Sequence, residues 1–379
     1  MFCMHLPISN SHIFELDNLQ YLSDPDQFYK FICKRLKESN YAYLACLNIG
    51  TNNKSVKLFK LLRERVRKNK FTKILIPSGS YHKSVELKRL INENGLKNII
   101  DLVDTDTLYI LPKIVNDFLS IFHIKCFIFD NEILLTGANL DDDYFTNRVD
   151  RYIIVKNDKL KKFIIEEIFK INMNIEVFKL TNEVDLNLIN QKIICIPFRE
   201  SNEFNLLKYL FELNYSKLTV SSAYSNFPVE IINILKNKEF NLYTPSPSIN
   251  IYQNFGIFNK VVTNIYSYSN YYVLSKCKKV NLYEYNRKNT SFHKKGIWMR
   301  YKDLAIMIVG SSNYNCRSIY KDKEMSYVLF SKNSGVINTW EGELKDVKKY
   351  SEKISLKTVS KRHFYILTVI VFYLLTNYL

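Results

Sequence analysis

The sequence predicts an α/β protein built as a duplicated α-β-α sandwich, with two pseudo-symmetric halves that share one active site, followed by an apolar C-terminal helix. Strand-like apolar runs alternate with amphipathic, helix-like segments along most of the 379 residues. The second half repeats the order of the first at an offset of about 170 residues, far longer than a solenoid period. Hydrophobic residues make up 47% of the chain and charged residues 24%, as in ordinary globular proteins, which excludes a disordered or collagen-like chain.

The elements of the first half follow from caps, breakers and apolar spacing. Asp24 is a good N-cap and Pro25 a good first-turn residue for a helix that ends near Glu38. Gly50 and Pro77 end two buried apolar runs, which we interpret as strands. Apolar side chains three and four residues apart predict the other helices, and alternation predicts hairpin strands. The expected strands are 43–49, 73–76, 98–103, 121–130, 132–136 and 151–155, and the later helices are 54–69, 82–94 and 159–172.

The second half shows the same succession of signals. A strand at 217–221 precedes a helix at 229–235, and a strand at 241–244 ends at Pro245 as its counterpart ends at Pro77. The remaining strands are expected at 280–285, 291–298 and 304–309. We therefore expect a first half over 1–175, a connector over 176–190, a second half over 191–346, a basic linker over 347–363 and a membrane-associated helix over 364–379.

The C-terminal segment 364–379 has no charged side chain and follows the basic cluster 361–363. Sixteen helical residues reach about 24 Å, short of the roughly 30 Å core of a bilayer. We expect this helix to span a thin membrane, to insert partly or to lie at the interface, with a buried helix as the alternative. The first basic residue is Lys30, so no N-terminal targeting segment is expected.

The chain has a net charge of +17, from 54 Lys and Arg against 37 Asp and Glu. Such a charge favours anionic partners, namely nucleic acid, anionic lipid or a phosphorylated substrate, and compositional bias is the alternative explanation. The expected helix at 54–69 has seven of the cations, on a face that we expect to be solvated. The seven Cys form no Cys-x-x-Cys pair, which argues against a zinc ribbon or a disulfide scaffold and predicts buried thiols.

The strongest chemical signal is a His-x-Lys triplet that occurs twice, in register with the repeat of the halves. The first copy is His123-Ile124-Lys125, followed by Asp130 and by Gly137-Ala138-Asn139. The second copy is His293-Lys294-Lys295, followed by Gly310-Ser311-Ser312-Asn313. A single His-x-Lys triplet occurs easily by chance, but two copies with matched downstream residues are not expected by chance.

Residues i and i+2 of a strand point to the same face, so each histidine and its lysine should face one site together. Two such sets, each with an imidazole, an ammonium and an amide, suit displacement at phosphorus through a phosphohistidine. One histidine attacks and the other transfers the proton of the leaving or entering oxygen. No metal is needed for this chemistry, and the sequence has no clear ligand cluster.

Asp150 and Glu324 follow the two histidines at matched distances, once a three-residue insertion is removed. They are our candidates for the carboxylates that fix the histidine tautomers. The alternative is that each lies on the surface and pairs with Arg151 or Lys321.

The first motif, His-x-Lys-x4-Asp with Asp130 at its end, resembles the duplicated signature of the phospholipase D superfamily. The second motif departs from it, because Arg300 stands at the Asp position and Asp303 is displaced by three residues. Longer blocks look like the eukaryotic phosphatidylglycerophosphate synthase family, and the similarity extends over nearly the whole chain to about residue 346. These blocks are 137–152, 292–298 and 310–318, with a weaker match at 244–247.

The resemblance implies that CDP-diacylglycerol and sn-glycerol 3-phosphate react to phosphatidylglycerophosphate and CMP, without a metal or another cofactor. We expect His123 to be the nucleophile and His293 to take the proton of the glycerol hydroxyl, with the opposite assignment as the alternative. Glycerol 3-phosphate is a dianion, so additional cations should bind it. The implied catalytic residues are His123, Lys125, Asp130, His293 and Lys295; the phosphate-binding residues are Asn139, Ser312 and Asn313; and the candidates for glycerol 3-phosphate are Arg148, Arg151 and Arg317.

The partners implied are the two substrates and an anionic membrane surface, with no nucleic acid. The location implied is a mitochondrion or a related organelle, with the endoplasmic reticulum as the alternative. Three other functions remain open: a cardiolipin synthase or similar transferase, a phosphodiesterase or nuclease of the same superfamily, and a degenerate lipid-binding protein. The missing second Asp is the only support for the last of these.

Overall fold

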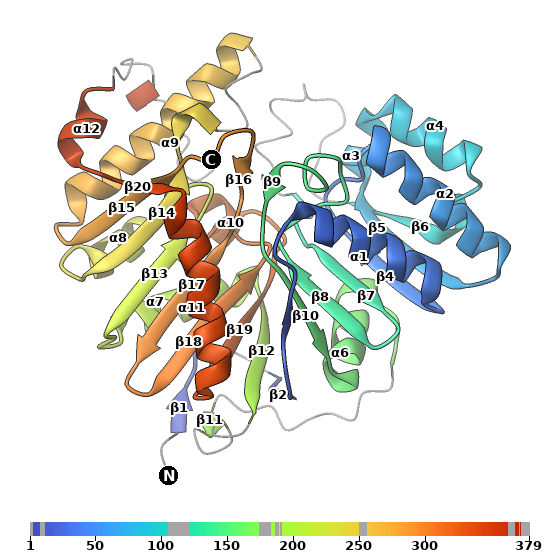
Figure 1. Cartoon of the computed structure of the whole chain (residues 1–379), viewed down its shortest axis with the longest axis horizontal. Helices are drawn as coiled ribbons and strands as arrows, with labels where there is room; N and C mark the ends of the chain where they lie inside the picture. The colour runs from blue at the N-terminus through green and yellow to red at the C-terminus, as the bar shows by residue number, and fades with distance from the viewer. Residues whose placement is uncertain are drawn as a thin grey trace.

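Two large mixed sheets meet near the middle of the molecule, with helices packed on their faces (Figure 1). The α/β class expected from the sequence is confirmed. The computed structural model describes residues 3–7, 12–104, 121–173, 183–185, 189, 192–249, 256–362, 368–370 and 372.

The first sheet combines three parallel strands with an antiparallel meander. β4 (Tyr41–Ala45) is parallel to β5 (Phe71–Pro77), which is parallel to β6 (Ile100–Val103), whereas β8 (Glu132–Thr136) is antiparallel to both β7 (Cys126–Phe129) and β10 (Tyr152–Lys156). Across the sheet the order is β3 (Gln20–Tyr21), β10 (Tyr152–Lys156), β8 (Glu132–Thr136), β7 (Cys126–Phe129), β4 (Tyr41–Ala45), β5 (Phe71–Pro77) and β6 (Ile100–Val103).

The second sheet is built in the same way and gains one strand at each edge. Its order is β2 (Phe14–Leu16), β12 (Ile193–Arg199), β19 (Met325–Ser331), β18 (Leu304–Gly310), β17 (Gly296–Tyr301), β13 (Lys217–Ser221), β14 (Phe240–Pro245), β15 (Val280–Tyr285) and β20 (Ser351–Ile354). The strands from β12 to β15 pair in the same order as those from β3 to β6. In both sheets, four antiparallel pairs are followed by two parallel pairs. Two short pairs lie outside these sheets: β1 (Cys3–His5) with β11 (Glu183–Asp185), and β9 (Arg148–Val149) with β16 (Ser291–Phe292).

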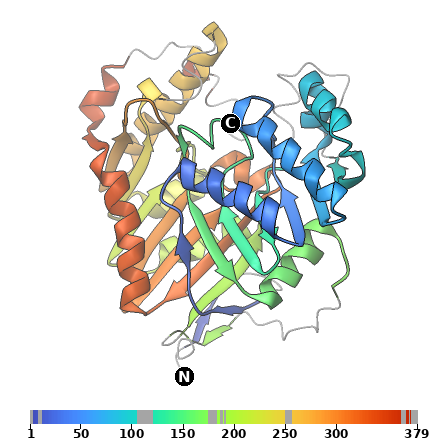
Figure 2. The same cartoon turned by 45° about the vertical axis from the view of Figure 1, so that its right-hand side comes forward.

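The helices begin where local sequence favours them. Asp24 caps the first helix as expected, because its carboxylate accepts from the Gln27 backbone N–H at 2.9 Å. The helix expected at 82–94 is instead two helices, since Ser84 caps the second by accepting from the Leu87 N–H at 3.1 Å. Figure 2 shows the blue helices lying across the first sheet. The described helices are α1 (Pro25–Glu38), α2 (Asn53–Arg67), α3 (Ser78–Lys83), α4 (Val85–Glu93), α6 (Asp158–Phe169), α7 (Glu200–Glu212), α8 (Val229–Leu235), α9 (Gly256–Lys276), α10 (Cys316–Tyr320), α11 (Ser334–Lys349) and α12 (Leu356–Ser360), with 3-10 turns η1 (Lys97–Ile99) and η3 (Pro247–Ile249).

The three largest hydrophobic cores among the described residues hold the layers together. One lies between the first sheet and α1, α2 and α4, and another between the second sheet and α7, α8 and α9. The third is shared: side chains such as Ile153 of the first sheet and Met307 of the second pack together there with those of α6 and α11. The two halves are therefore joined by a common core rather than by a linker alone. Most of the cysteines are buried free thiols, as expected: Cys46, Cys126, Cys195, Cys277 and Cys316, with Cys33 half-buried.

The expected domain boundaries differ from the structure at both ends. β2 lies within the expected first half but pairs with β12 of the second sheet. The expected basic linker 347–363 is wrong, because β20 pairs with β15 and completes the second sheet. Arg362 secures the end of this segment through an ion pair with the buried Glu284 at 2.6 Å. The expected connector 176–190 falls mostly outside the described residues.

The apolar C-terminal segment 364–379 also lies mostly outside the described residues. Of its described residues, Phe372 is buried and packs its ring against Tyr268 of α9, with the ring centroids 5.0 Å apart. In the part of the chain that the structure describes, no helix combines the length and apolar character required to cross a membrane.

Candidate active site

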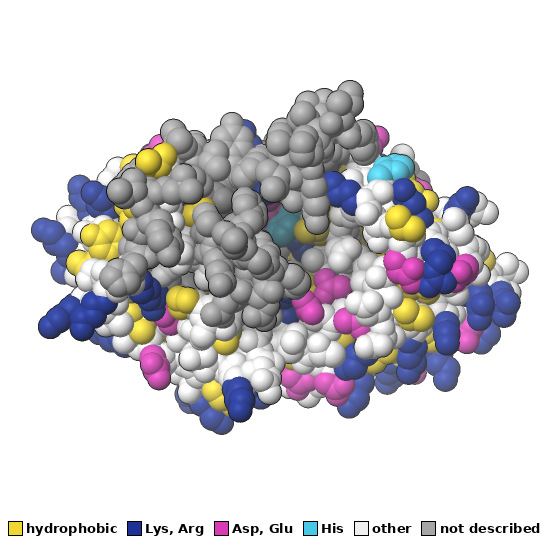
Figure 3. All heavy atoms as spheres, turned by 90° about the horizontal axis from the view of Figure 1, so that it is seen from above, with side chains coloured by type: hydrophobic (Ala, Val, Ile, Leu, Met, Phe, Trp, Pro, Cys, Tyr) yellow, Lys and Arg dark blue, Asp and Glu magenta, His cyan; other side chains and the backbone are white. Residues whose placement is uncertain are grey.

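The two His-x-Lys segments lie where the halves cross. The His123 backbone N–H donates to the Lys323 carbonyl at 2.9 Å, and the His293 N–H donates to the Val149 carbonyl at 2.9 Å. The second contact extends the parallel pair of β9 and β16. Each histidine is therefore fixed by a backbone segment of the other half. Seen from above, a histidine side chain lies deep near the middle of the molecule, while Lys and Arg gather toward its outer ends (Figure 3).

The two expected carboxylates contact the histidines, but crosswise between the halves. Asp150 of the first half lies 2.8 Å from Nδ1 of His293, through its Oδ2. Glu324 of the second half lies 2.7 Å from Nδ1 of His123, through its Oε1. Both carboxylates are buried, at 2% and 1% exposure, so the alternative of surface carboxylates is wrong. For His123, the Glu324 carboxylate at Nδ1 holds the tautomer that leaves Nε2 as the reactive nitrogen.

Lys125 and Lys295 are enclosed in the same space. Lys125 donates to the His123 carbonyl at 2.7 Å, and Lys295 Nζ lies 3.6 Å from Asp150 Oδ2. Burial lowers the pKa of both lysines, that of Lys125 to about 7, and the positive charge of Lys295 further lowers the pKa of Lys125. An anion bound between the two ammonium groups would offset both effects, which suits a phosphate site.

Gly137 borders this space, and the expected amide and hydroxyl residues follow the ends of β8 and β18. A Cβ at Gly137 would lie 2.9 Å from Lys295 Nζ and 3.1 Å from both Asp150 oxygens, so only glycine leaves room for them. Asn139 accepts from the Leu47 N–H at 3.2 Å, which orients its amide. Asn313 Oδ1 is buried and has no hydrogen-bond partner among the described residues. Ser312 Oγ accepts from the Tyr314 N–H at 2.9 Å, which places it in the same turn.

Asp130 does not lie in this site, contrary to the expectation that it is catalytic. It occupies the exposed β7–β8 turn at a φ of 51° and accepts from the Asn40 and Tyr41 N–H groups at 3.0 and 2.9 Å. Its role is to tie this turn to the start of β4. The corresponding hairpin of the second half places Lys302 and Asp303 in its turn, so the Asp missing from the second motif does not alter the site.

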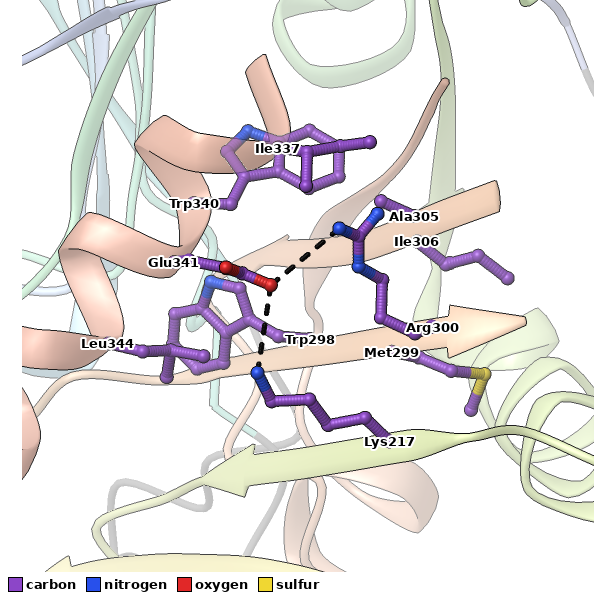
Figure 4. A pocket seen from close by; sticks show the side chains of 10 residues that line it. All are labelled: Lys217, Trp298, Met299, Arg300, Ala305, Ile306, Ile337, Trp340, Glu341 and Leu344. Carbon is purple, nitrogen blue, oxygen red and sulfur yellow. Dashed lines mark ion pairs between the residues drawn. The ribbon is translucent and has the colours of Figure 1, made fainter. Parts of the chain in front are cut away.

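Arg300 lies on β17, at the end remote from His293. It borders an apolar pocket between α11 and the second sheet, where Trp298 and Trp340 form walls and Glu341 lies between two cations (Figure 4). Glu341 Oε1 is 3.6 Å from both Arg300 Nη2 and Lys217 Nζ. This pocket is separate from the histidines and belongs to the packing of α11.

The three candidate arginines have different surroundings. The Arg148 guanidinium lies 4.9 Å from the Tyr144 ring centre and pairs with Asp143 at 2.7 Å. Arg317 Nε pairs with Asp322 at 3.0 Å.

Arg151 is not a ligand for glycerol 3-phosphate, contrary to expectation. Its side chain is fully buried and bonds Glu343 through two nitrogens at 2.7 and 2.9 Å, and it donates to the Ile308 carbonyl at 2.7 Å. It also donates to the Lys295 carbonyl at 3.3 Å, so its role is to hold the backbone of the second motif in place. The sequence did not indicate this, because Glu343 is nearly 200 residues away along the chain.

The structure adds residues that the motif analysis did not single out. The Tyr144 hydroxyl lies 2.8 Å from Nδ1 of His293, and Ser311 donates to Glu324. Asp322 accepts from the Ile121 N–H at 3.1 Å and so supports the segment before His123. Burial raises the pKa of Glu324 to about 7 and that of Asp322 above its usual range. In the sequence, the only signal for Tyr144 and Asp322 is that they lie a few residues before Asp150 and Glu324, the orienting carboxylates.

Ligand atoms of His123, Asp322 and Glu324 all lie within 4.8 Å of one another, a geometry that could hold a metal ion. Each carboxylate already has a protein partner, since Glu324 contacts His123 and Asp322 pairs with Arg317. A metal ion here would have to replace these contacts and would face the ammonium of Lys125.

No family model matches the chain. Curated relatives match most of it. A probable CDP-diacylglycerol–glycerol-3-phosphate 3-phosphatidyltransferase of Dictyostelium discoideum is 24% identical, over 96% of this chain and 78% of its own length. The enzyme of the same name from Saccharomyces cerevisiae is 23% identical over 91% and 84%, and the mitochondrial one from Gallus gallus is 20% identical over 87% and 76%. The family resemblance of the sequence motifs is confirmed by these relatives.

Solved structures share the fold. The phosphatidylserine synthase of Haemophilus influenzae Rd KW20 superposes with a TM-score of 0.78, over 99% of this chain and 98% of that one, at 15% identity. The polyphosphate kinase of Porphyromonas gingivalis gives a TM-score of 0.56 at 9% identity, over 94% of this chain and 52% of that one. At these identities the likeness concerns the fold alone.

Proposed function

We propose that this chain is a phosphatidyltransferase that converts CDP-diacylglycerol and sn-glycerol 3-phosphate into phosphatidylglycerophosphate and CMP. The proposal depends on one observation above all: two His-x-Lys pairs meet in a chain whose curated relatives are named for this reaction. The phosphatidyl group would be carried on a histidine between the two half-reactions. The product would enter phosphatidylglycerol and cardiolipin synthesis.

The proposal includes a duplicated origin for the two halves. The shared strand order of the two sheets supports it, as do the matched contacts of the two histidines. In this proposal, one imidazole lies on each side of a single phosphorus atom. That is the arrangement required for attack and departure on opposite faces.

His123 is the nucleophile in this proposal. Its Nδ1 faces Glu324, and among the described residues this is its only side-chain hydrogen bond. Nε2 of His293, in contrast, already lies 3.2 Å from Lys295 Nζ and 3.4 Å from the Tyr144 hydroxyl. Burial lowers the pKa of both histidines well below the usual value, so both are neutral at pH 7. Neutral imidazole is the form that attacks phosphorus and the form that accepts a proton.

In the first half-reaction, Nε2 of His123 attacks the lipid-side phosphorus and the P–O bond to CMP breaks. CMP leaves as a stabilised anion. In the second, the glycerol hydroxyl attacks the phosphatidyl-histidine, His293 takes the hydroxyl proton, and the P–N bond breaks. The ammonium groups of Lys125 and Lys295 and the amides of Asn139 and Asn313 stabilise the phosphoryl oxygens, with Ser312 beside them.

The acceptor phosphate would bind to Arg148, with Arg317 as the second cation. Arg148 lies on the side of His293, the proposed base for the acceptor hydroxyl, through its contact with the Tyr144 ring. A dianion beside a guanidinium gains charge-assisted hydrogen bonds.

The substrate is a membrane lipid, so we also propose that the protein works on an anionic membrane surface, in a mitochondrion or a related organelle. The net charge of +17 and the mitochondrial name of the Gallus gallus relative support this, and the endoplasmic reticulum is the alternative.

The test uses detergent-purified protein, CDP-diacylglycerol and labelled glycerol 3-phosphate, with a chelator in place of added metal. Wild-type protein should form labelled phosphatidylglycerophosphate and CMP, and His123→Ala should form neither. His82→Ala, which changes an exposed histidine, should retain the wild-type rate.

Release of CMP and phosphatidic acid without labelled lipid would instead indicate a hydrolase or a different acceptor alcohol. No turnover, with or without metal, would favour the lipid-binding alternative.

A further inference from the structure

The two halves contain corresponding ion pairs of opposite polarity. Asp150 and Glu324 are corresponding positions of the two halves. Asp143 lies seven residues before Asp150, and Arg317 lies seven residues before Glu324. Arg148 lies two residues before Asp150, and Asp322 lies two residues before Glu324. Arg148 pairs with Asp143 at 2.7 Å and Asp322 pairs with Arg317 at 3.0 Å. The same bridge is thus made twice, with anion and cation exchanged.

The reversed polarity of the ion pair in the second half places an anion beside His123. The carboxylate of Asp322, the carboxylate of Glu324 and a ring nitrogen of His123 all lie within 4.8 Å of one another. Asp322 is 4% exposed, so water screens its charge poorly. Burial, Lys125, Lys295 and Arg317 lower the pKa of His123, and Asp322 acts against them.

The ion pair of the first half places a cation on the side of His293. Arg148 stacks over the Tyr144 ring, and the Tyr144 hydroxyl lies 2.8 Å from Nδ1 of His293. At the position of Tyr144 the second half has Ser318, which accepts from the Asn313 N–H at 3.1 Å. Burial and Lys295 lower the pKa of His293, and Arg148 lowers it further, against Asp150. The corresponding side chains of this pair therefore bring an anion toward His123 and a cation toward His293.

We propose that Asp322 is a positioning residue that makes His123, and not His293, the histidine that bonds to phosphorus. This inference depends on the proposed phosphatidyltransferase function. When Nε2 of His123 attacks, its lone pair forms the P–N bond, and the electron pair of the broken P–O bond leaves with CMP. Because Nδ1 keeps its proton, the ring becomes a cation. Asp322 and Glu324 stabilise that cation, whereas the corresponding position beside His293 has Arg148 and would oppose it.

The test isolates the first half-reaction. Labelled CMP exchanges into CDP-diacylglycerol only if the phosphatidyl-enzyme forms and reverts, and no acceptor is needed. The decisive variant is the double exchange Arg317→Asp with Asp322→Arg, which keeps an ion pair but reverses its polarity. The matched control exchanges a surface pair of the same length, Asp303→Lys with Lys332→Asp, whose atoms are 3.0 Å apart. Asp322→Asn is the second variant, because it removes the charge and keeps the shape.

We expect the reversed pair to lower the maximal exchange rate at least tenfold, or about 1.4 kcal/mol, without changing the KM for CMP or the melting temperature. Asp322→Asn should lower the same rate in the same direction, and it decides the question if the double variant does not fold. The surface exchange should have no effect. Acid-quenched protein should have the labelled phosphatidyl group on His123.

Wild-type exchange rates in both Asp322 variants, or an adduct on His293, would overturn the inference while leaving the proposed function intact. Wild-type protein that forms phosphatidylglycerophosphate but exchanges no CMP would overturn the phosphatidyl-histidine step and the inference with it, whereas protein that does neither would overturn the proposed function as well.

Discussion

Among the described residues, no carboxylate pairs directly with the buried Lys125 ammonium, which instead donates to the His123 carbonyl at 2.7 Å, and this environment determines how the site responds to pH. Burial lowers the pKa of Lys125 to about 7, and burial raises the pKa of Glu324 to about 7. In the proposed mechanism, phosphate binding requires the protonated lysine, and orientation of His123 requires the ionised carboxylate. The two requirements oppose each other across the same pH range.

We therefore expect kcat/KM for CDP-diacylglycerol to be bell-shaped with an optimum near pH 7. It rises as Glu324 loses its proton and falls as Lys125 loses its own, because these are the free-enzyme ionisations. Initial rates at low substrate from about pH 5 to pH 9 measure the profile. The exposed Lys323→Arg should leave it unchanged, and a flat profile would contradict this prediction.

Gly137 offers a second prediction at the scale of single atoms. Gly137→Ala should lower activity about 100-fold, because the added methyl group displaces Lys295 and Asp150 from their positions. The folded state should persist, as followed by thermal unfolding.

The matched control is Gly342→Ala in α11, where an added Cβ meets nothing within 4 Å. This change should leave activity unaltered and raise the unfolding free energy by about 0.5–1 kcal/mol, as alanine does in a helix interior. Equal activity in the two alanine variants would contradict the packing argument.

The basic helix α2 is a clear case in which one element contains residues of different function. Most of its cations lie on the surface, but Arg65 is 1% exposed. It donates to the carbonyls of Leu36 and Ser39 at 2.8 Å and of Phe71 at 2.9 Å. These carbonyls end α1 and begin β5, so a single guanidinium joins three elements.

Arg65→Ala should lower the unfolding free energy by about 3 kcal/mol or more, since several buried carbonyls lose a charged donor. Denaturant unfolding measures the difference. The exposed Arg67→Ala, two residues further along α2, should stay within about 0.5 kcal/mol of wild type. Similar losses in both variants would mean that helix propensity, rather than the buried contacts, explains the effect.

At the scale of the molecule, the shared core and the crossed carboxylates make the two halves interdependent. Neither histidine has its orienting carboxylate within its own half. In the proposed function, a membrane would deliver the lipid substrate to a site that both halves build, and the net charge of +17 favours anionic surfaces.

We expect the protein to bind vesicles that contain anionic lipid more strongly than neutral phosphatidylcholine vesicles of the same size. Raising the salt to about 0.5 M should weaken this binding, because screening shortens the reach of surface charges. Flotation of the full chain with each kind of vesicle measures it. Binding that depends neither on lipid charge nor on salt would assign the association to apolar contacts.

Local chemistry explains which features could be predicted from the sequence. The start of α1 depends on Asp24 and Pro25, which act within one helical turn. The His-x-Lys pairs, Gly137 and Asn139 were identified because their spacing repeats in the second half. The α/β class followed from periodicity, which each element contains in itself.

The tertiary structure alone decided which groups meet. Asp150 contacts His293 across 143 residues and Glu324 contacts His123 across 201, so no spacing rule within a half could assign these pairs. The same applies to Arg151, which resembles a substrate-binding cation in the sequence but is neutralised inside the protein by Glu343. Asp130 belongs to the motif by sequence and to a turn by structure. Residue type and periodicity determine the chemistry that is available and the elements that form, whereas the crossing of two halves over a shared core determines which charges face each histidine.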